Sequence, residues 1–367
     1  MQLAVDGRTH PRWLSLWSLL AAVAMLAGTQ VSAMAAPPPP SYDVVELGTL
    51  GGNASFGLDL NDRDQVAGNS RTGTSTLPLL GFVWSDGAMT ELGTLPGSNQ
   101  FSRGYGINNA GVVVGESDNN RPRAFRREAG AMSDIGDLGG GSAVAHGVNE
   151  PGQIVGASSN GQASRPFVWW QDEMRDLGTV AGGTATPGRA WSVNNRGDIV
   201  GFSRVAGTTS QATLWAGPNR PRLGQPVGLG SLGDGERFSE AFAINDRQQV
   251  VGRSLVTGST ERAFLWTQDA GMTDLGALGL NHSRATDVNQ RGQVVGYAST
   301  FAGFPTFSAA AGFLWENGTM HDLNDLIDAD TGWELLAAEG INSRGAITGY
   351  GRIDGQTRAF LLVPTGR

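Results

Sequence analysis

The sequence predicts an all-β fold, a seven-bladed β-propeller of four-stranded antiparallel blades closed by its N-terminal strand, and two observations support this prediction. The first is a repeat in which an asparagine is followed by a glycine seven residues later. The copies start 41 to 53 residues apart, and a fixed interval inside a variable period indicates a repeated supersecondary unit with loops of variable length. The seven pairs are Asn61/Gly68, Asn108/Gly115, Asn149/Gly156, Asn194/Gly201, Asn245/Gly252, Asn289/Gly296 and Asn342/Gly349.

The second observation is that the two ends of the repeat array complement each other. Residues 42–48 resemble the fourth strand of a unit that lacks its first three strands, and residues 358–362 resemble a third strand that lacks a fourth. A circular array closes in this way, whereas an open solenoid needs capping repeats at its ends. We therefore predict that residues 42–367 form one closed ring of seven repeats.

Each repeat reads as four short strands. In the sixth copy we predict strands at 283–288, 292–298, 311–315 and 320–323, because these runs are short, β-branched or aromatic, and bounded by turn-forming residues. The Asn-x-x-Gly connection suits a three-residue hairpin whose glycine is left-handed and whose asparagine caps the turn. Asp64 and Gln248 replace this glycine in two copies, and Pro151 in the third copy leads us to expect a different turn there.

The third and fourth strands carry residues that we assign to the frame of the fold. Five tryptophans recur on strand three, with Arg126 and Leu361 at this position in the other two copies, and we expect them to pack between neighbouring blades. An acidic residue precedes most of the Leu-Gly pairs on strand four, where we expect turn acceptors or arginine partners. The fourth copy departs from this pattern at 220–223, Arg-Pro-Arg-Leu. The tryptophans are Trp84, Trp169, Trp215, Trp266 and Trp315.

The first 35 residues read as a signal peptide. Arg8 and Arg12 precede an apolar run at 14–28, and Ala33-Met34-Ala35 resembles a cleavage site. The run is shorter than the roughly 20 residues that a spanning helix needs. Residues 36–41 form a proline-rich tether. We therefore expect a soluble mature protein in the periplasm or outside the cell, without a membrane anchor after cleavage.

The composition excludes several kinds of chemistry. The chain contains no cysteine and no lysine, which excludes disulfides, thiolate metal sites, Schiff-base catalysis and P-loop lysines. A formal net charge of −8 argues against nucleic acid as a partner. We predict no cofactor and no metal, and we expect a monomer.

Four motifs resemble a known family of proteins. The segments LGTLGG at 47–52, GINNAGVVVG at 106–115, RAFLW at 262–266 and MTDLG at 272–276 are similar to the HAF repeats of extracellular bacterial proteins. The tripeptide that names the family reads Arg-Ala-Phe here, at 123–125, 262–264 and 358–360. The resemblance covers essentially the whole repeat array. It implies export and a repeat fold, and it supplies no catalytic residues.

Function is expected where the repeats differ. Two positions on the first strand vary widely, three and five residues before each asparagine (positions −3 and −5), while positions −4 and −2 are small in nearly every copy. Position −3 reads Leu58, Tyr105, His146, Trp191, Phe242, Thr286 and Glu339. Position −5 reads Phe56, Arg103, Val144, Arg189, Glu240, Arg284 and Ala337.

The innermost strand of a propeller lines the central channel, so these positions are expected to ring one of its mouths. The alternative is that both positions pack between blades, which strand alternation favours and the charged side chains oppose. We predict a surface for stacking and hydrogen bonding to a ligand. Its predicted residues are Arg103, Tyr105, His146, Arg189, Trp191, Glu240, Phe242, Arg284 and Glu339.

Three functions fit these features. The first is a non-catalytic binding module for a glycan, peptide or envelope partner. The second is a carbohydrate-active enzyme, a polysaccharide lyase or glycosidase-like protein, with His146 as base beside Arg103, Arg189 or Glu339. The third is a purely structural or assembly protein. The longer loops at 72–80, 217–230 and 300–310 are further candidates for a binding surface.

Overall fold

The structure is a computed structural model that describes residues 39–73, 79–98, 101–118, 120–205, 209–217, 225–235, 238–301 and 310–365. All of them belong to the unit Pro39–Arg367. The signal peptide predicted at 1–35, and residues 36–38 of the predicted tether, lie outside the described residues. Within the described ranges, no helix is long and apolar enough to cross a membrane.

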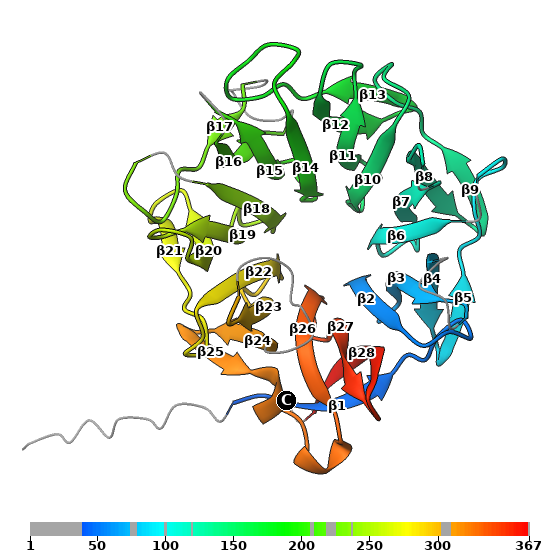
Figure 1. Ribbon diagram of the computed structural model, residues 1–367, viewed down its shortest axis with the longest axis vertical. Helices are drawn as coiled ribbons and strands as arrows, with labels where there is room; N and C mark the ends of the chain where they lie inside the picture. Colours follow the sequence, from blue (N-terminus) through cyan, green and yellow to red (C-terminus); the bar gives the residue numbers. More distant parts are fainter. Residues whose placement is uncertain are drawn as a thin grey trace, which may run out of the picture. The chain divides into compact units, whose positions relative to one another are not determined.

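Seven four-stranded antiparallel sheets stand around a common axis, which confirms the predicted seven-bladed propeller (Figure 1). We number the blades 1 to 7 in chain order, beginning with the blade that contains β2. The innermost strands are β2 (Ser55–Leu60), β6 (Ser102–Ile107), β10 (Ala143–Val148), β14 (Gly188–Val193), β18 (Ser239–Ile244), β22 (His282–Val288) and β26 (Glu334–Ile341). The second strands are β3 (Val66–Arg71), β7 (Val113–Ser117), β11 (Ile154–Ser159), β15 (Ile199–Arg204), β19 (Val250–Leu255), β23 (Val294–Ser299) and β27 (Ile347–Ile353).

The outer half of each blade holds the third and fourth strands. The third strands are β4 (Leu79–Ser85), β8 (Arg123–Glu128), β12 (Ser164–Trp170), β16 (Ser210–Trp215), β20 (Glu261–Thr267), β24 (Ala310–Glu316) and β28 (Gln356–Thr365). The outermost strands are β5 (Ala88–Glu91), β9 (Ala131–Asp134), β13 (Glu173–Asp176), β17 (Val227–Gly228), β21 (Gly271–Asp274), β25 (Thr319–Asp322) and β1 (Ser41–Glu46). Two 3-10 helices, η1 (Leu323–Asp325) and η2 (Ala329–Thr331), precede β26. The segment 220–223 lies outside the described residues, and β17 is the fourth strand of blade 4.

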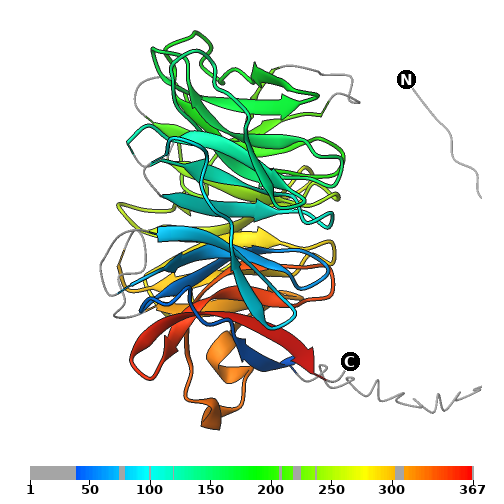
Figure 2. The same ribbon diagram turned by 90° about the vertical axis from the view of Figure 1, so that its right-hand side faces the viewer.

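The ring closes through its terminal strands, as predicted. β1 pairs antiparallel with β28 in a register that runs from Ser41 opposite Thr365 to Glu46 opposite Phe360. Figure 2 shows β1 in blue beside β28 in red. Blade 7 is therefore built from both ends of the repeat array.

The repeated asparagine caps its own hairpin, as the sequence predicts. In every blade its Oδ1 accepts the backbone N–H of the residue four positions later, at 2.8 to 3.1 Å. The residue three positions after it is left-handed in every blade, including Asp64 (φ 59°) and Gln248 (φ 58°).

The expectation of a different turn at Pro151 is wrong. Gly152 N–H donates to the Asn149 carbonyl at 3.0 Å, as the equivalent residues do in the other blades. Glu150 N–H also donates to Asn195 Oδ1 of the next blade at 3.0 Å. The proline ring fixes φ near −65°, which this position of a tight turn accepts.

The same asparagine also joins each blade to the next. Its Nδ2 donates to the backbone carbonyl of the next repeated asparagine, at 2.9 to 3.1 Å in all seven blades. The series ends with Asn342, which donates to the carbonyl of Asn61. We call this closed set of hydrogen bonds the amide ring.

The repeated glycine is explained by a β-bulge. In all seven blades the pairing of the innermost strand with its neighbour shifts register between positions −4 and −2, which leaves position −3 without a partner. The glycine sits opposite the bulge, where a Cβ atom would lie 1.8 to 2.1 Å from the carbonyl oxygen of position −5. No other residue fits in that space.

The third strands fill the spaces between blades. Six phenylalanines are fully buried, and each lies opposite the repeated glycine of its blade: Phe82, Phe125, Phe167, Phe264, Phe313 and Phe360. The tryptophan position is two residues further on. In blades 2 and 7 this residue is Arg127 or Leu362. The prediction that Arg126 and Leu361 occupy the tryptophan position is therefore wrong by one residue. In these two blades there is no tryptophan, so the register can be read only from the phenylalanine.

Replacing Trp215 by alanine is expected to lower the free energy of unfolding by about 3–5 kcal/mol. Trp215 is 4% exposed and packs with Val155, Val168 and Leu177 of the preceding blade. The measurement is urea denaturation, with the 37% exposed Trp170 replaced by alanine as control. Equal midpoints for the two variants would contradict the assignment of Trp215 to the packing between blades.

The acidic residues of strand four serve the frame. Asp134, Asp176 and Asp274 each accept the backbone N–H of the glycine two residues later, at 2.8 Å. Each also lies within 4 Å of an arginine on the adjoining third strand. Both predicted roles, turn acceptor and arginine partner, are confirmed for these residues.

Candidate functional site

A cavity of about 340 Å³ opens at one mouth of the central channel. It is lined by the C-terminal ends of all seven innermost strands and by the turns that follow them. All seven residues of position −3 line it. A bulged residue leaves the alternation of its strand, so on an innermost strand it can face the axis instead of the adjoining blade. Position −3 therefore lines the cavity, and its aromatic members also contact one another across neighbouring blades.

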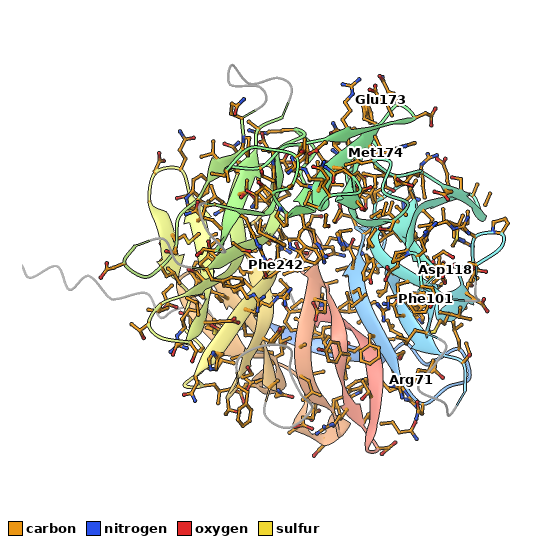
Figure 3. The ribbon with its side chains drawn as sticks, turned by 45° about the horizontal axis from the view of Figure 1, so that its top comes forward. Arg71, Phe101, Asp118, Glu173, Met174 and Phe242 are labelled. Atoms are coloured by element: carbon orange, nitrogen blue, oxygen red, sulfur yellow. The ribbon has the colours of Figure 1, made fainter. Side chains whose placement is uncertain are left out.

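One side of the cavity floor is aromatic. Tyr105, His146, Trp191 and Phe242, from blades 2 to 5, form a continuous series that we call the aromatic arc. Their ring centroids are 5.4, 4.3 and 5.8 Å apart in that order. Figure 3 shows Phe242 near the axis, in contrast to Glu173 and Met174 at the periphery. The arc offers a stacking surface made of side chains that differ in every blade.

The charged residues of position −5 lie behind this arc instead of in the cavity. Arg189 lies over the Trp191 ring at 4.8 Å and Arg284 over the Phe242 ring at 3.7 Å. Arg103 pairs with Glu116 at 3.3 Å, and Tyr105 donates its hydroxyl to the same carboxylate at 2.8 Å.

The fourth charged residue of position −5, Glu240, also has a partner. It accepts from Arg253 at 2.8 Å, and Arg253 pairs with Glu261 as well. Arg189 lines a second cavity, of about 360 Å³, together with Val144 of the same position in blade 3.

The nine predicted ligand-binding residues thus divide into two groups. Tyr105, His146, Trp191, Phe242 and Glu339 line the central cavity. Arg103, Arg189, Glu240 and Arg284 support it from behind, and among the described residues that line the cavity there is no arginine. Much of the longer loops at 72–80, 217–230 and 300–310 lies outside the described residues.

Sequence reasoning missed two acidic residues of the cavity. Asp59 and Asp287, which we call the acidic pair, occupy position −2 in blades 1 and 6. Asp59 accepts the N–H of Leu60 and of Ile107 in the next blade, both at 2.8 Å. Asp287 accepts the N–H of Val288 and of Ile341 in the same way, at 2.8 Å. The signal was present, because these are the two residues that break the pattern of small side chains at position −2.

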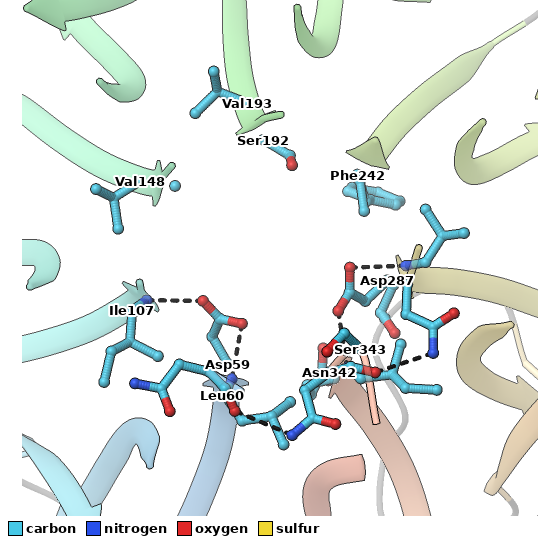
Figure 4. A pocket seen from close by; sticks show the side chains of 18 of the residues that line it. Asp59, Leu60, Ile107, Val148, Ser192, Val193, Phe242, Asp287, Asn342 and Ser343 are labelled. Carbon is cyan, nitrogen blue, oxygen red and sulfur yellow. Dashed lines mark hydrogen bonds between the residues drawn. The ribbon is translucent and has the colours of Figure 1, made fainter. Parts of the chain in front are cut away.

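The acidic pair makes the cavity asymmetric. Figure 4 shows Asp59 and Asp287 on one side and Val148, Ser192 and Val193 on the other. Position −2 is Gly147, Ser192 or Ala243 in blades 3 to 5, and none of these residues has a carboxylate. Because hydrogen-bonded and non-bonded pairs alternate in an antiparallel ladder, the N–H groups just before the asparagines face the axis. Blades 3 to 5 therefore present these donors to the cavity without a carboxylate from position −2.

Burial controls the protonation of the deep side chains. Burial, with a contribution from Asp287, raises the pKa of Asp59 to about 8. Burial likewise raises the pKa of Asp287 to about 6 and that of Glu339 to about 7. The pKa of His146 is well below its usual value, because of burial and then the nearby Arg189. His146 is therefore neutral at neutral pH.

The rim of the cavity is a second hydrogen-bonded set that the sequence did not reveal. In blades 1 to 6 the residue after the asparagine accepts, through its side chain, the backbone N–H of the corresponding residue in the preceding blade. Six such links measure 2.7 to 3.2 Å. The rim residues are Asp62, Asn109, Glu150, Asn195, Asp246, Gln290 and Ser343.

Comparisons with known proteins establish the fold alone. No protein-family model and no curated protein matches the chain, so membership of the HAF repeat family stays a prediction. The chain is similar to the β-propeller domain of the Trilobed protease from Pyrococcus furiosus, with 10% identity and a TM-score of 0.52 over 86% of this chain and 93% of that one.

Two further solved structures are similar to the chain over a smaller share of their own length. A puromycin-hydrolyzing peptidase from Mycobacterium tuberculosis matches with 10% identity and a TM-score of 0.53, over 90% of this chain and 55% of that one. TolB from Acinetobacter baumannii matches with 12% identity and a TM-score of 0.42, over 63% and 53%. The chain thus spans about half the length of these two proteins.

Proposed function

We propose that this protein is an exported, monomeric binding module whose central cavity recognises a peptide, a glycan or another partner in the cell envelope. One observation carries the proposal. The residues that repeat in every blade build the frame, whereas the residues of position −3, which differ between blades, converge on a single cavity. A frame of fixed hydrogen bonds around unlike side chains is the usual arrangement of a preformed site. The resemblance to extracellular HAF repeats supports export.

The test is a screen of the full chain on glycan and peptide arrays, repeated with Trp191→Ala. Trp191 is one of the two inner rings of the aromatic arc, so its loss is expected to weaken binding of any hit that stacks there by about tenfold. The estimate takes the roughly 1–3 kcal/mol that a nucleic-acid base gains by stacking on an aromatic side chain as a guide. The control is Trp170→Ala, because Trp170 is 37% exposed and does not line the cavity.

Two results bear directly on the proposal. Hits that survive Trp191→Ala unchanged would place the binding surface elsewhere. A pull-down from the native envelope that recovers protein partners while both arrays stay empty would favour a structural or assembly role. Melting curves of both variants separate a lost contact from a lost fold.

A carbohydrate-active enzyme is the second candidate, because two buried carboxyl groups meet in one cavity. Both oxygens of Asp59 and both oxygens of Asp287 are occupied by backbone N–H groups. Of the partners predicted for His146 in a lyase, Glu339 lines the cavity with it, whereas Arg103 and Arg189 do not, so neither arginine is placed there to neutralise a substrate carboxylate. We therefore expect no release of reducing ends from any glycan hit. Turnover that Asp59→Asn abolishes would instead establish the enzyme.

A further inference from the structure

We propose, resting on the proposed function, that the central cavity takes an uncharged acetamido sugar whose amide carbonyl oxygen accepts backbone N–H groups of blades 3 to 5. The ground is a ring of donors that the protein fills only in part. The residue just before each repeated asparagine (position −1) carries a backbone N–H that faces the channel. In blades 1, 2, 6 and 7 the acidic pair accepts this N–H, whereas in blades 3 to 5 position −2 supplies no carboxyl group.

The direction of these N–H groups follows from the hairpin. In blades 3 to 5 each repeated asparagine donates its own N–H to the carbonyl of the residue four positions later, at 2.9 to 3.1 Å. That pair is hydrogen-bonded, so the next pair along the antiparallel ladder is not. The N–H groups of Val148, Val193 and Ile244 belong to this next pair and point away from the second strand. They face the channel, and Val148 and Val193 line its cavity.

The acidic pair shows which kind of group this ring of donors binds. Asp59 places one oxygen on the N–H of Leu60 and the other on the N–H of Ile107 in the next blade, both at 2.8 Å (Figure 4). Asp287 joins blades 6 and 7 in the same way, also at 2.8 Å. Two adjacent N–H groups of position −1 thus hold the oxygen atoms of one side chain.

A ligand oxygen can take the corresponding place in blades 3 to 5. There position −2 is Gly147, Ser192 or Ala243, so no carboxyl side chain stands between the cavity and the N–H groups. Val193 is the middle donor of the three, and both adjacent pairs include it. A hydrogen bond made in a site partly closed from water is stronger than one on the surface.

The charges around the cavity favour an uncharged oxygen acceptor. Although two backbone N–H groups donate to Asp59, burial raises its pKa to about 8, so its carboxyl group is neutral at neutral pH. The rim adds the carboxyl groups of Asp62, Glu150 and Asp246, which repel an anion at the mouth. The carbonyl oxygen of an amide accepts N–H groups without carrying a charge.

The rest of the cavity suits a sugar that carries this amide. The aromatic arc offers ring faces to the apolar side of a pyranose and to the acetamido methyl group. The rim consists of carboxyl, amide and hydroxyl side chains, which can donate to or accept from sugar hydroxyls. A volume of about 340 Å³ lies at the lower end of the roughly 300–1,000 Å³ found for small-ligand pockets, so one terminal sugar residue fits it better than the middle of a chain.

The experiment follows the backbone amide signals of the full chain by NMR at neutral pH while three uncharged probes are added. The probes are N-acetylglucosamine, glucose, which lacks the acetamido group, and acetyl-alanine-methylamide, which carries the same amide on a peptide. We expect N-acetylglucosamine to bind with a Kd on the order of 1 mM and glucose to bind at least about tenfold more weakly. The amide proton signals of Val148 and Val193 are expected to move to higher chemical shift, because a new hydrogen bond deshields them.

Ser192→Asp tests the site by filling it from within. Placed as Asp59 is in blade 1, the new carboxyl group accepts the N–H groups of Val193 and Ile244, so binding of N-acetylglucosamine is expected to fall at least about tenfold. Ser192→Asn brings an uncharged oxygen to the same place and is also expected to weaken binding, which keeps the test valid if the aspartate variant does not fold. The control is Ala131→Asp, at the exposed start of β9. Melting curves show which variants are folded.

Three results would overturn the inference. They are equal binding of N-acetylglucosamine and glucose, unchanged signals of Val148 and Val193 in the presence of bound sugar, and undiminished binding by folded Ser192→Asp or Ser192→Asn. Tighter binding of acetyl-alanine-methylamide than of N-acetylglucosamine would also overturn it, because the amide would then belong to a peptide.

The outcomes separate this inference from the proposed function. If an array hit depends on Trp191 but none of the three probes binds, the cavity is a binding site and the acetamido sugar is wrong. If neither the arrays nor the probes give binding, both are wrong.

Discussion

Gly252→Ala is expected to lower the free energy of unfolding by about 3 kcal/mol, at the upper end of the usual cost of overpacking. A Cβ atom at this position would lie 2.0 Å from the Glu240 carbonyl oxygen and 2.9 Å from the Ala241 Cα. Both are backbone atoms of β18, held by the ladder of the blade. Relief of the clash therefore requires the bulge to move, and with it the cavity residue Phe242.

The measurement is urea denaturation followed by tryptophan fluorescence. Gly73→Ala is the matched control, because no atom lies within 4 Å of its new Cβ and its backbone is not left-handed. There, alanine is expected to leave stability unchanged or to raise it slightly through the unfolded chain. If Gly252→Ala unfolds at the wild-type midpoint, the repeated glycine is not required by the bulge.

Asp59→Asn is expected to change how stability depends on pH, by about 5 kcal/mol between pH 4 and pH 8. Burial raises the pKa of Asp59 to about 8 in the folded protein, from 3.8 as the ordinary value. Between these two values the unfolded chain gives up the proton and the folded protein keeps it. Because the folded state binds more protons, the free energy of unfolding falls as pH rises through this window. A difference of one pKa unit between the folded and unfolded states corresponds to about 1.36 kcal/mol.

Asparagine removes this titration and keeps one acceptor oxygen for the backbone. The variant is therefore expected to lose stability relative to wild type at pH 5 and to recover or exceed it at pH 8.5. Denaturant curves at both values measure the change, and Asp43→Asn on the exposed face of β1 controls for the loss of one charge. A constant difference between Asp59→Asn and wild type at both pH values would show that Asp59 does not hold its proton.

The sequence was sufficient for the frame because the frame is local and repeated. The left-handed residue after each asparagine, the capping by Asn Oδ1 and the strands of blade 6 all follow from short-range patterns. The closure by β1 also followed, because a missing strand at one end matched a surplus strand at the other. The tryptophan position was assigned to Arg126 and Leu361 instead of Arg127 and Leu362, in the two blades where tryptophan is absent.

The site was harder to predict from the sequence, because it is formed by residues of different blades that meet only in the folded ring. The sequence of a single repeat does not reveal the β-bulge, because the glycine that permits it cannot be told from an ordinary glycine in a strand. Simple alternation treats positions −3 and −5 alike, whereas the bulge turns Trp191 into the cavity and leaves Arg189 behind it. Asp59 and Asp287 could have been noticed as exceptions, but their partners Ile107 and Ile341 belong to other repeats.

The amide ring has a mechanical consequence for recognition. Each blade donates a hydrogen bond to the next blade, and the series closes where Asn342 donates to Asn61. The mouth of the channel is therefore bounded by a closed ring of hydrogen bonds. Widening it at one point would break bonds on both sides of a blade. A ligand must therefore fit a cavity mouth whose width is already fixed. Because the protein does not have to close around the ligand, binding costs it less conformational entropy.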